Sequence, residues 1–360
     1  MKAVLLCAGE GVRLRPLTHV RPKHLLPVAG RAVLDWVLCD LAEAGVAEVI
    51  VVVSPEARRL REFVGDGGRW GLSASYVVQP QARGLAHALA CARDTIAADE
   101  RFLMYLGDDL LDRAVVSDFT RDFAAGDADA SLVVKPVLDP RAFGVVVLED
   151  GCVCRLVEKP EEPPSDLAIV GVYGFGPAIW EALDGLQPSA RGELEITDAI
   201  DRLVRAGRRV TCHVTDGFWA DAGSPAALLS ANRYFLGLLE RRIDGEVDGG
   251  STIEGEVRIE AGTRVARSQI TGPCLIGPDC VIEDCRIGPH VAVGAGCTLV
   301  ATDVAGSIID EGCRVVRVRP GLHQTILGPK ACLADLSARD GGALSMLVAD
   351  DTIIGLAGGG

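Results

Sequence analysis

The sequence contains no run of apolar residues long enough to cross a lipid bilayer, which takes about 20 consecutive apolar residues. It also lacks a secretion signal, because the first apolar stretch, Val4–Ala8, is short and is followed at once by glycines and charged residues. Membrane-spanning and secreted classes are therefore not expected. We predict a cytoplasmic protein without a membrane partner.

Paired cysteine motifs are missing as well, although the chain contains 12 cysteines. Cys152 and Cys154 are separated by one residue, which is too few for a CxxC redox or zinc motif. Disulfides are rare outside oxidising compartments, so a disulfide framework is not expected either.

The chain has no surplus of positive charge, and its formal net charge is −14. A surface this acidic repels phosphate backbones, so nucleic acid is not an expected partner. The first 31 residues differ, because they contain six basic residues and a single acid, Glu10. A basic segment in an acidic protein indicates a small anionic ligand.

The 360 residues are 49% apolar, enough for full hydrophobic cores, and at roughly 150 residues each they allow about two domains. In the first part of the chain, short apolar runs alternate with segments of helical periodicity. We expect strands at Lys2–Cys7, Val49–Val53, Tyr76–Val78 and Phe102–Leu106, and helices at Val33–Ala44 and Leu85–Ile96. This alternation predicts a Rossmann-like α/β fold, with a mostly parallel sheet covered by helices on both faces. Ligands of such sheets bind beyond the carboxyl ends of the strands.

The pattern changes near residue 245. Residues 241–250 are polar and glycine-rich, and we interpret them as a linker. Branched apolar residues then recur in steps of six, six and five, so that every third one is 17 positions further along. They are Ile253, Ile259, Val265, Ile270, Ile276, Ile282, Ile287, Val293, Leu299 and Val304. This spacing predicts a three-sided, left-handed parallel β-helix of hexapeptide repeats over residues 250–355, after a first domain over residues 1–240.

The same register accounts for five cysteines. Each of them lies two residues before an apolar repeat position: Cys274, Cys280, Cys285, Cys297 and Cys313. Free cysteine behaves as a small buried hydrophobic residue, whereas zinc ligands show tighter paired spacings. We therefore predict that these side chains pack inside the β-helix.

A glycine-rich segment, GEGVRL (residues 9–14), follows the first strand. Glycines allow a sharp turn close to a ligand, and backbone N–H groups in such a turn can cradle phosphates. The Walker sequence GxxxxGK[ST] is absent, and Leu14 replaces the third glycine of GxGxxG. The continuation, RLRPLT (residues 13–18) and RPKHLLPV (residues 21–28), is more specific.

These segments resemble the signature of the sugar nucleotidyltransferase family, G-x-G-x-R-L-x-P-x-T followed by P-K-x-L-L-P-V. Further matching blocks lie at residues 79–86, 106–108, 143–145, 157–160, 171–173, 191–198 and 219–223. With its repeat-containing tail, the chain is most similar to the long-form glucose-1-phosphate thymidylyltransferases of that family. The resemblance implies in-line attack of a sugar phosphate oxygen on the α-phosphorus of a nucleoside triphosphate, with release of pyrophosphate.

The resemblance also implies a role for each matching residue. Arg13 and Lys23 neutralise the triphosphate, with Arg13 as a planar fork and Lys23 as a point charge. Asp108 and Asp221 bind Mg²⁺, which prefers oxygen ligands and retains some water. Without the resemblance, the alternative for the two basic residues is that they are solvated loop charges, and metal binding by the two aspartates is about as well supported as a structural role. Asp108 would then be a turn residue, and Asp221 would mark the entry to a helix capped by Ser224.

Substrate contacts follow from the same comparison. Gly9 and Gly11 contact the nucleotide phosphates, and Gln79 reads a pyrimidine edge with Gly84 packed close by. The sugar phosphate site comprises Gly144, Glu158, Lys159, Val172 and Arg191. Glu158 accepts hydrogen bonds from sugar hydroxyls, whereas Thr197 is expected only to cap a helix over residues 198–206.

Five positions depart from the usual family residues, and they leave the substrates open. These positions are Val12, His24, Arg83, Asp109 and Ala222. The expected pair is dTTP with α-D-glucose 1-phosphate. Another nucleotide, another sugar or a cyclitol phosphate are alternatives.

Two other classes of function remain. The β-helix could carry an acyltransferase site, for which His290 and His323 are the candidate bases, or the chain could be a non-catalytic sugar-nucleotide sensor. A sensor would be expected to have lost at least one of the four charged residues of the proposed catalytic site. All four are present: Arg13, Lys23, Asp108 and Asp221. We expect a homo-oligomeric enzyme.

Overall fold

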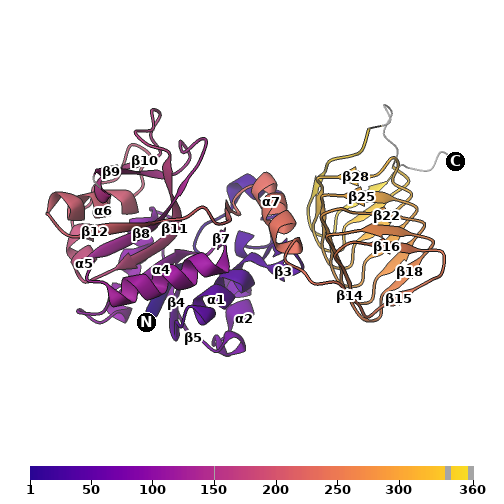
Figure 1. The fold of residues 1–360 in the computed structure, drawn as a ribbon, viewed down its shortest axis with the longest axis horizontal. Coiled ribbons are helices and arrows are strands. Elements are labelled where there is room, and N and C mark those ends of the chain that lie inside the picture. Colours follow the sequence, from indigo (N-terminus) through magenta and orange to yellow (C-terminus); the bar gives the residue numbers. More distant parts are fainter. Residues whose placement is uncertain (150, 337–341, 356–360) are drawn as a thin grey trace. The chain divides into compact units, whose positions relative to one another are not determined.

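The structure is a computed structural model that describes residues 1–149, 151–336 and 342–355 (Figure 1). The chain divides into two units. The first consists of residues 1–9 and 34–221, and the second of residues 10–33 and 222–360. Each is described separately. Among the described residues, no helix is long and apolar enough to span a membrane.

The first unit is built on a mixed sheet of nine strands. Its strands are β1 (Lys2–Leu6), β4 (Glu48–Val53), β5 (Ser73–Val78), β6 (Phe102–Leu106), β8 (Ala130–Pro136), β9 (Gly144–Glu149), β10 (Cys152–Glu158), β11 (Leu167–Phe175) and β12 (Val210–Val214). Strands β6, β1, β4 and β5 are adjacent and parallel. The predicted Rossmann-like parallel core is confirmed. Beyond it, β11 pairs antiparallel with β6, β8 and β9, so that the sheet becomes mixed.

Both faces of the parallel core are buried, which explains the near-continuous apolar runs of its strands. On one face, alternate residues of β1, such as Val4 and Leu6, join a core cluster with residues of α3, α5 and α6. The intervening residues Ala3 and Leu5 are fully buried on the other face. The helices of this unit are α1 (Val33–Glu43), α2 (Arg58–Val64), α3 (Leu85–Cys91), α4 (Arg113–Ala125), α5 (Ala178–Leu183) and α6 (Ile196–Arg205).

The predicted elements differ from the structure mainly at their ends. The helix expected at Leu85–Ile96 ends at Cys91, and a separate 3-10 turn, η4 (Arg93–Thr95), follows it. The strand expected at Tyr76–Val78 begins three residues earlier, because β5 pairs with β4 along its full length. A further 3-10 turn, η3 (Gly68–Trp70), precedes β5.

Directly after β6, a short antiparallel ladder joins β7 (Asp109–Leu111) to β13 (Trp219–Asp221). Asp109 and Asp221 are Cα partners in this ladder. A segment more than 100 residues away in sequence is thereby held at the carboxyl end of β6, where ligands of parallel sheets bind.

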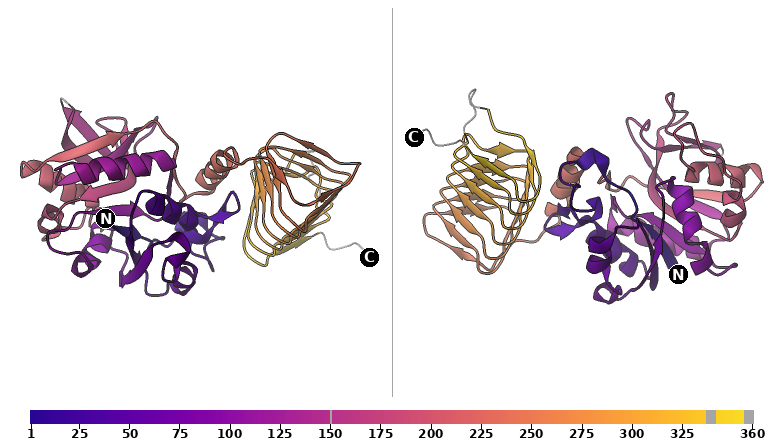
Figure 2. Two further views of the ribbon diagram at one scale, coloured as in Figure 1. Left: turned by 60° about the horizontal axis from the view of Figure 1, so that its bottom comes forward. Right: turned by 180° about the vertical axis from the view of Figure 1, so that it is seen from behind.

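The second unit contains the β-helix, whose strands form three parallel sheets (Figures 1 and 2). One sheet contains β14 (Arg242–Ile243), β17 (Val257–Ile259), β20 (Cys274–Ile276), β23 (Val291–Val293), β26 (Ile308–Ile309), β29 (Ile326–Leu327) and β31 (Leu347–Val348). Another contains β15 (Glu246–Val247), β18 (Arg264–Ala266), β21 (Val281–Glu283), β24 (Thr298–Val300), β27 (Arg314–Val316), β30 (Cys332–Ala334) and β32 (Ile353–Gly355). The third contains β16 (Thr252–Glu254), β19 (Gln269–Thr271), β22 (Arg286–Ile287), β25 (Asp303–Ala305) and β28 (Leu322–His323).

This is the predicted left-handed parallel β-helix, and its pairing reproduces the 17-residue period, since Ile253 pairs with Ile270 and Ile270 with Ile287. The prediction of a linker over residues 241–250 is wrong. This segment already forms β14 and β15, because its few apolar residues take the first positions of the repeat. Residues 337–341 of the predicted β-helix lie outside the described residues.

The five repeat cysteines are all buried in the β-helix core, as predicted. They are free thiols. Burial raises the pKa of Cys274 to about 12 and that of Cys285 to about 11. Such thiols stay protonated and contribute to packing rather than to reactivity.

The second unit also includes the signature segment, residues 10–33. It contains two 3-10 turns, η1 (Val12–Leu14) and η2 (Lys23–Leu25), and the hairpin of β2 (Pro27–Val28) and β3 (Arg31–Ala32). Helix α7 (Pro225–Leu236) packs against β2 and against β23 of the β-helix. The domain division at residues 240–250 stays a prediction.

Three contacts hold the signature segment within the second unit. Arg21 forms an ion pair of 2.7 Å with Asp310 of the β-helix, and both side chains are largely buried. The backbone N–H of Ala29 donates to Oδ1 of Asn232 on α7, at 2.8 Å. Gly30 lies so close to the Leu275 side chain that any side chain at position 30 would overlap it.

Candidate active site

The carboxylates proposed as metal ligands lie at the β7–β13 ladder. Asp108 is buried and immediately precedes β7, and Asp221 is the last residue of β13. Opposed Cα atoms in an antiparallel ladder lie about 4.5–5.5 Å apart, so the ladder brings the backbones of Asp108 and Asp221 to the same end. The structure thus brings together two acids that are 113 residues apart in sequence.

Asp109 holds this ladder together from inside. Its carboxylate accepts a hydrogen bond of 2.6 Å from the Trp219 indole N–H, and its side chain is 4% exposed. Its other oxygen lies against the backbone of Gly171, where no larger residue would fit. Sequence reasoning noted Asp109 only as a departure from asparagine, because the Trp219 contact arises only in the folded chain.

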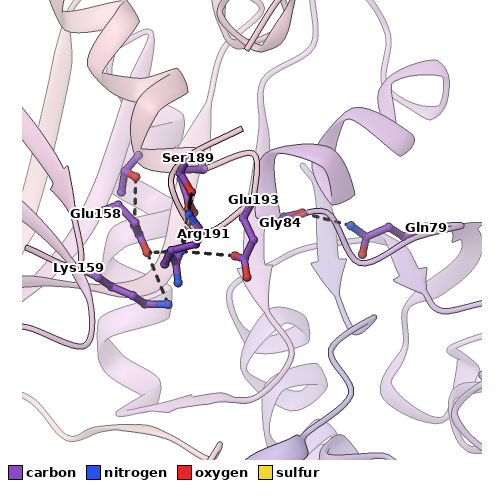
Figure 3. A network of polar contacts seen from close by, with 9 residues as sticks. Gln79, Gly84, Glu158, Lys159, Ser189, Arg191 and Glu193 are labelled. Atoms are coloured by element: carbon purple, nitrogen blue, oxygen red, sulfur yellow. Dashed lines mark hydrogen bonds and ion pairs between the residues drawn. The ribbon is translucent and has the colours of Figure 1, made fainter. Parts of the chain in front are cut away.

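Glu158 lies at the centre of a polar network (Figure 3). It is the last residue of β10 and pairs with Gly144 of β9. Thr197 donates a hydrogen bond of 3.0 Å to one carboxylate oxygen of Glu158. The other oxygen lies 3.3 Å from the Arg191 guanidinium and 3.7 Å from the Lys159 ammonium. Three predicted sugar-site residues therefore meet at one carboxylate.

Thr197 was expected to cap a helix, but it does not. Helix α6 begins at Ile196, with Glu195 in the N-cap position, which leaves Thr197 inside the first turn. Its side chain points instead to β10 and bonds Glu158. The prediction placed the helix start two residues too late, and the partner across the fold carries no local sequence signal.

Arg191 is held mainly by a residue that sequence reasoning missed. Its guanidinium lies 2.8 and 2.9 Å from the two oxygens of Glu195, and Ser189 donates to the same carboxylate at 2.6 Å. Glu195 is 4% exposed, whereas Arg191 is more than one-third exposed. A buried carboxylate thus fixes a cation that still reaches solvent and Glu158.

The electrostatics of this network disfavour ionisation of Glu158. Burial is the main cause that raises the pKa of Glu158, and the nearby charge of Glu195 raises it further. Lys159, Thr197 and Arg191 act in the opposite direction but do not cancel the effect. Glu158 therefore loses its negative charge at a higher pH than an ordinary glutamate does.

The predicted base-reading residues lie on a loop after β5. Gln79 is buried, and its Nε2 donates to the Gly84 carbonyl at 3.2 Å. Gly84 has a φ of +98°, and a Cβ there would lie 2.5 Å from the Leu194 carbonyl oxygen. Only glycine fits such a conformation and such a close approach. Gly84 therefore packs closely against Leu194, and its role beside the base stays a prediction.

Two backbone hydrogen bonds join this loop to the segment that carries Arg191. The Leu194 N–H donates to the Arg83 carbonyl at 2.8 Å, and the Ala86 N–H donates to the Leu194 carbonyl at 3.1 Å. We call this pair of bonds, with Gly84 between them, the Leu194 clasp. Through it, the Gln79 loop and the Arg191 segment are directly connected.

The two remaining sugar-site candidates have different surroundings. Gly144 is close to Thr197 and Glu158, and a Cβ there would lie 2.7 Å from the Thr197 methyl carbon and 3.2 Å from a Glu158 oxygen. Val172 lies opposite Tyr105 in the sheet, and its side chain is fully buried. The lining roles of both residues stay predictions.

The basic candidates belong to the second unit. Gly11 adopts a φ of +67°, and a Cβ there would be 3.1 Å from both Lys23 Cβ and Thr18 Cγ2. Thr18 also donates a hydrogen bond of 2.8 Å to the Gly11 carbonyl. Arg13 is exposed on η1, and Lys23 begins η2. The turn at Gly11 therefore packs directly on the Lys23 side chain, while Gly9 ends the first-unit segment.

His24, next to Lys23, is fully buried. Neither ring nitrogen has a hydrogen-bond partner among the described residues. Burial, together with the neighbouring Lys23 charge, holds the pKa of His24 well below its usual range. His24 is therefore neutral at physiological pH and leaves Lys23 as the charged member of η2.

The chain is similar to several known proteins. The nucleotidyl transferase family profile matches residues 2–236. The chain is 43% identical over 320 residues to a glucose-1-phosphate thymidylyltransferase of Streptomyces griseus, covering 89% of this chain and 90% of that protein. It is 40% identical over 313 residues to the low-salt glycan biosynthesis nucleotidyltransferase Agl11 of Haloferax volcanii, covering 86% and 87%. A crystal structure described as a glucose-1-phosphate thymidylyltransferase of Bacillus anthracis in complex with sucrose superimposes with a TM-score of 0.61 at 33% identity. The match covers 65% of this chain and 94% of that one.

Proposed function

The chain belongs to the nucleotidyl transferase family, and we propose that it is an enzyme that transfers the nucleotidyl group of a nucleoside triphosphate to a sugar 1-phosphate, releasing pyrophosphate. The Leu194 clasp is the observation that supports this reaction best. It joins a loop suited to reading a base to a carboxylate network suited to binding sugar hydroxyls, as a reaction between these two substrates requires.

Both substrates are anions, so catalysis consists mainly of positioning and charge neutralisation. In the proposal, Arg13 and Lys23 bind the triphosphate oxygens, and the backbone turn at Gly9 and Gly11 accommodates the phosphates. The sugar phosphate oxygen then attacks the α-phosphorus in line with the departing pyrophosphate.

Asp108 and Asp221 suit a divalent cation, and we propose that they hold Mg²⁺. The β7–β13 ladder places two carboxylates at the end of β6, and oxygen donors of this kind are those that Mg²⁺ prefers. No group of three or more His, Cys, Asp or Glu side chains in the described ranges could hold a metal ion. Two carboxylates would leave the other positions to phosphate and water. When bound, Mg²⁺ would neutralise charge on the reacting phosphates.

The Glu158 network fits the second substrate. An ionised Glu158 accepts hydrogen bonds from sugar hydroxyls, and Lys159 supplies a cation for the sugar phosphate. Arg191, fixed by Glu195, adds a second cation at the same place. The mixture of one acceptor and two cations matches a sugar that carries a phosphate group.

We propose dTTP and α-D-glucose 1-phosphate as the preferred pair, with UTP as a weaker donor. The relative from Streptomyces griseus carries the name of that activity, and Gln79 suits a pyrimidine edge. Altered sugar choice remains the alternative, because Val12 and Ala222 replace hydroxyl-bearing residues of the family pattern.

A substrate panel tests this proposal. Each common nucleoside triphosphate is combined with several hexose 1-phosphates and cyclitol phosphates, and pyrophosphate release is measured with Mg²⁺. Highest kcat/KM with dTTP and glucose 1-phosphate is the expected result. Preference for ATP or GTP would contradict the base assignment, whereas turnover only with another sugar or a cyclitol phosphate would contradict the sugar assignment. No pyrophosphate release with any pair would contradict the reaction itself.

We further propose that the β-helix stabilises or assembles the enzyme and does not take part in the chemistry. Its core is a continuous stack of branched apolar side chains and protonated cysteines. Of the two histidines considered for acyl transfer, His290 has a pKa lowered chiefly by burial, and its Nδ1 is buried without a hydrogen-bond partner in the described structure. Absence of acyl-CoA turnover by the full chain is the expected result.

A further inference from the structure

The side-chain amide of Gln79 has a fixed orientation. Its Nε2 lies 3.2 Å from the Gly84 carbonyl oxygen and 3.0 Å from Nδ1 of His87. A backbone carbonyl only accepts hydrogen bonds, so the amide must place its NH₂ group, and not its oxygen, toward Gly84. Gln79 is only 5% exposed, and its backbone N–H is bonded to Val53, so the whole residue is held in place.

His87 is the second acceptor for the same NH₂ group. It lies on α3, one turn after the Gly84 loop. Because Nδ1 faces a donor, the neutral ring must carry its proton on Nε2, which lies 4.0 Å from the Cys91 sulfur. Both N–H bonds of the Gln79 amide are therefore directed to acceptors within the protein, and Oε1 remains for a ligand.

An amide oxygen presented to a base selects for a ring N–H. Thymine and uracil carry a hydrogen on N3, whereas cytosine has an unprotonated N3 that can only accept. A flipped amide would present NH₂ and would reverse this preference. Buried polar groups left unpaired discriminate strongly between such analogues.

We propose that His87 is a specificity-determining residue, which holds Gln79 with Oε1 toward the base and thereby selects thymine and uracil over cytosine. This inference rests on the proposed function, in which Gln79 reads the base. His87 itself is a positioning residue, since its contact is with Gln79 and not with the substrate.

UTP and CTP provide the test, because the two rings have the same size and differ in hydrogen bonding at positions 3 and 4. The quantity measured is the ratio of kcat/KM for UTP to kcat/KM for CTP, with glucose 1-phosphate as acceptor. The wild-type enzyme should favour UTP by at least about a hundredfold. His87→Lys puts a donor in place of the acceptor, opposes the Gln79 NH₂ group, and should lower the ratio at least about tenfold.

Three further variants make the test specific. His87→Gln can again offer an acceptor to Gln79 and should restore the ratio to within about threefold of wild type. Cys91→Ala alters the opposite face of the His87 ring and should leave the ratio unchanged. Should His87→Lys not fold, His87→Leu, which removes the acceptor without adding charge, should still lower the ratio, by a smaller factor.

The outcomes separate this inference from the proposed function. A wild-type ratio near one would contradict base reading by Gln79 and, with it, the role of His87. A high wild-type ratio that folded His87→Lys or His87→Leu leaves unchanged would overturn the role of His87 alone. Equal losses of activity with UTP and CTP would show that His87 only supports the structure.

Discussion

At the scale of single residues, the proposed site assigns some carboxylates to ligand binding and others to contacts within the protein. Asp108 and Asp221 occupy the end of the β7–β13 ladder, whereas the neighbouring Asp109 is bonded to Trp219 and packed against Gly171. Glu158 and Glu195 divide in the same way, since Glu195 is occupied by Arg191 and Ser189. Exact roles thus follow from contacts that adjacent sequence positions do not share.

Replacement of either proposed metal ligand should abolish most catalysis. We expect Asp108→Asn and Asp221→Asn each to lower kcat at least about a hundredfold, or about 2.7 kcal/mol of transition-state stabilisation, because charge on the phosphates is no longer neutralised. The measurement is pyrophosphate release at saturating Mg²⁺. Asp216→Asn, at an exposed position before β13, is the matched control and should retain normal activity. Near-normal turnover of either ligand variant would show that its carboxylate does not bind the metal.

The pH dependence of sugar phosphate use should depend on Glu195. An ionised Glu158 accepts hydrogen bonds from sugar hydroxyls more strongly than a protonated one, and the Glu195 charge raises the pKa of Glu158. Glu195→Gln removes that repulsion and lowers the pKa of Glu158. Consequently the acid-side decline of kcat/KM for the sugar phosphate should move to lower pH.

The control for this experiment is Glu193→Gln. Glu193 also contacts Arg191, but it is not among the groups that shift the pKa of Glu158. Its pH profile should match that of wild type. An acid limb that stays in place or moves upward in Glu195→Gln would refute the assignment of this limb to Glu158.

At the scale of secondary structure elements, the Leu194 clasp links two loops that are more than 100 residues apart in sequence. It requires Gly84, because any side chain there would meet the Leu194 backbone. The glycine at position 84 is therefore what allows the proposed base-reading loop to approach and bond the segment that carries Arg191.

Gly84→Ala should cost more than the same substitution at a glycine with open surroundings. Alanine at a φ of +98° is strained, and its Cβ would also lie 2.5 Å from the Leu194 oxygen. We expect a loss of about 3 kcal/mol or more in the free energy of unfolding and a higher KM for the triphosphate. Gly45→Ala, at a φ of +79° with nothing within 4 Å of a Cβ, should cost only about 1 kcal/mol. Urea denaturation measures the unfolding free energy of both variants, and steady-state kinetics measures the KM for the triphosphate. Equal losses of unfolding free energy in the two variants would show that the clasp does not restrict residue 84.

The elements that sequence reasoning predicted are those whose patterns are local and repeated. Apolar runs predicted β1, β4 and β6 to within a residue at each end, and the six-residue steps predicted the β-helix. The antiparallel insertion of β11 was not predicted, since strand order depends on distant pairing. The linker prediction failed because β14 and β15 contain only two residues each, too few to show periodicity.

The residues of the candidate site differ in the same way: those in contiguous motifs could be proposed from the sequence, and those that act through distant contacts could not. Arg13, Lys23, Asp108 and Asp221 were proposed because matching family motifs surround each of them in the sequence. The partners of those motifs were missed: Glu195, Trp219 and His87 each act through a contact that forms only in the folded chain. Periodicity and motif spacing contain no information on such pairs.

At the scale of the whole molecule, the second unit combines the signature segment with the β-helix. The ion pair between Arg21 and Asp310 joins residues 289 positions apart, and Arg21 lies only two residues before Lys23. A tail that is proposed to take no part in the chemistry can therefore still fix the segment that is proposed to bind the triphosphate.

Disruption of that ion pair should affect both stability and turnover. Asp310→Asn leaves the largely buried Arg21 charge unpaired, and we expect a loss of about 3 kcal/mol in unfolding free energy, together with lower kcat. Asp335→Asn breaks a similar pair with Arg317 that is mostly exposed, and it should cost no more than about 1 kcal/mol. Denaturant unfolding and steady-state kinetics measure the two effects. If the two variants are equally stable and equally active, the β-helix does not support the signature segment through Arg21.

The pairing of Arg21 with Asp310 also has a consequence for synthesis on the ribosome. The two residues are 289 positions apart, which at about 5–20 residues per second corresponds to about 15–60 seconds of translation. Throughout that interval the signature segment has been made, but the β-helix coil that it pairs with has not. A nascent chain released or stalled before this coil emerges would expose the Arg21 segment without its partner. Because translation proceeds from the N-terminus, the signature segment is made early but is one of the last segments to reach its final packing.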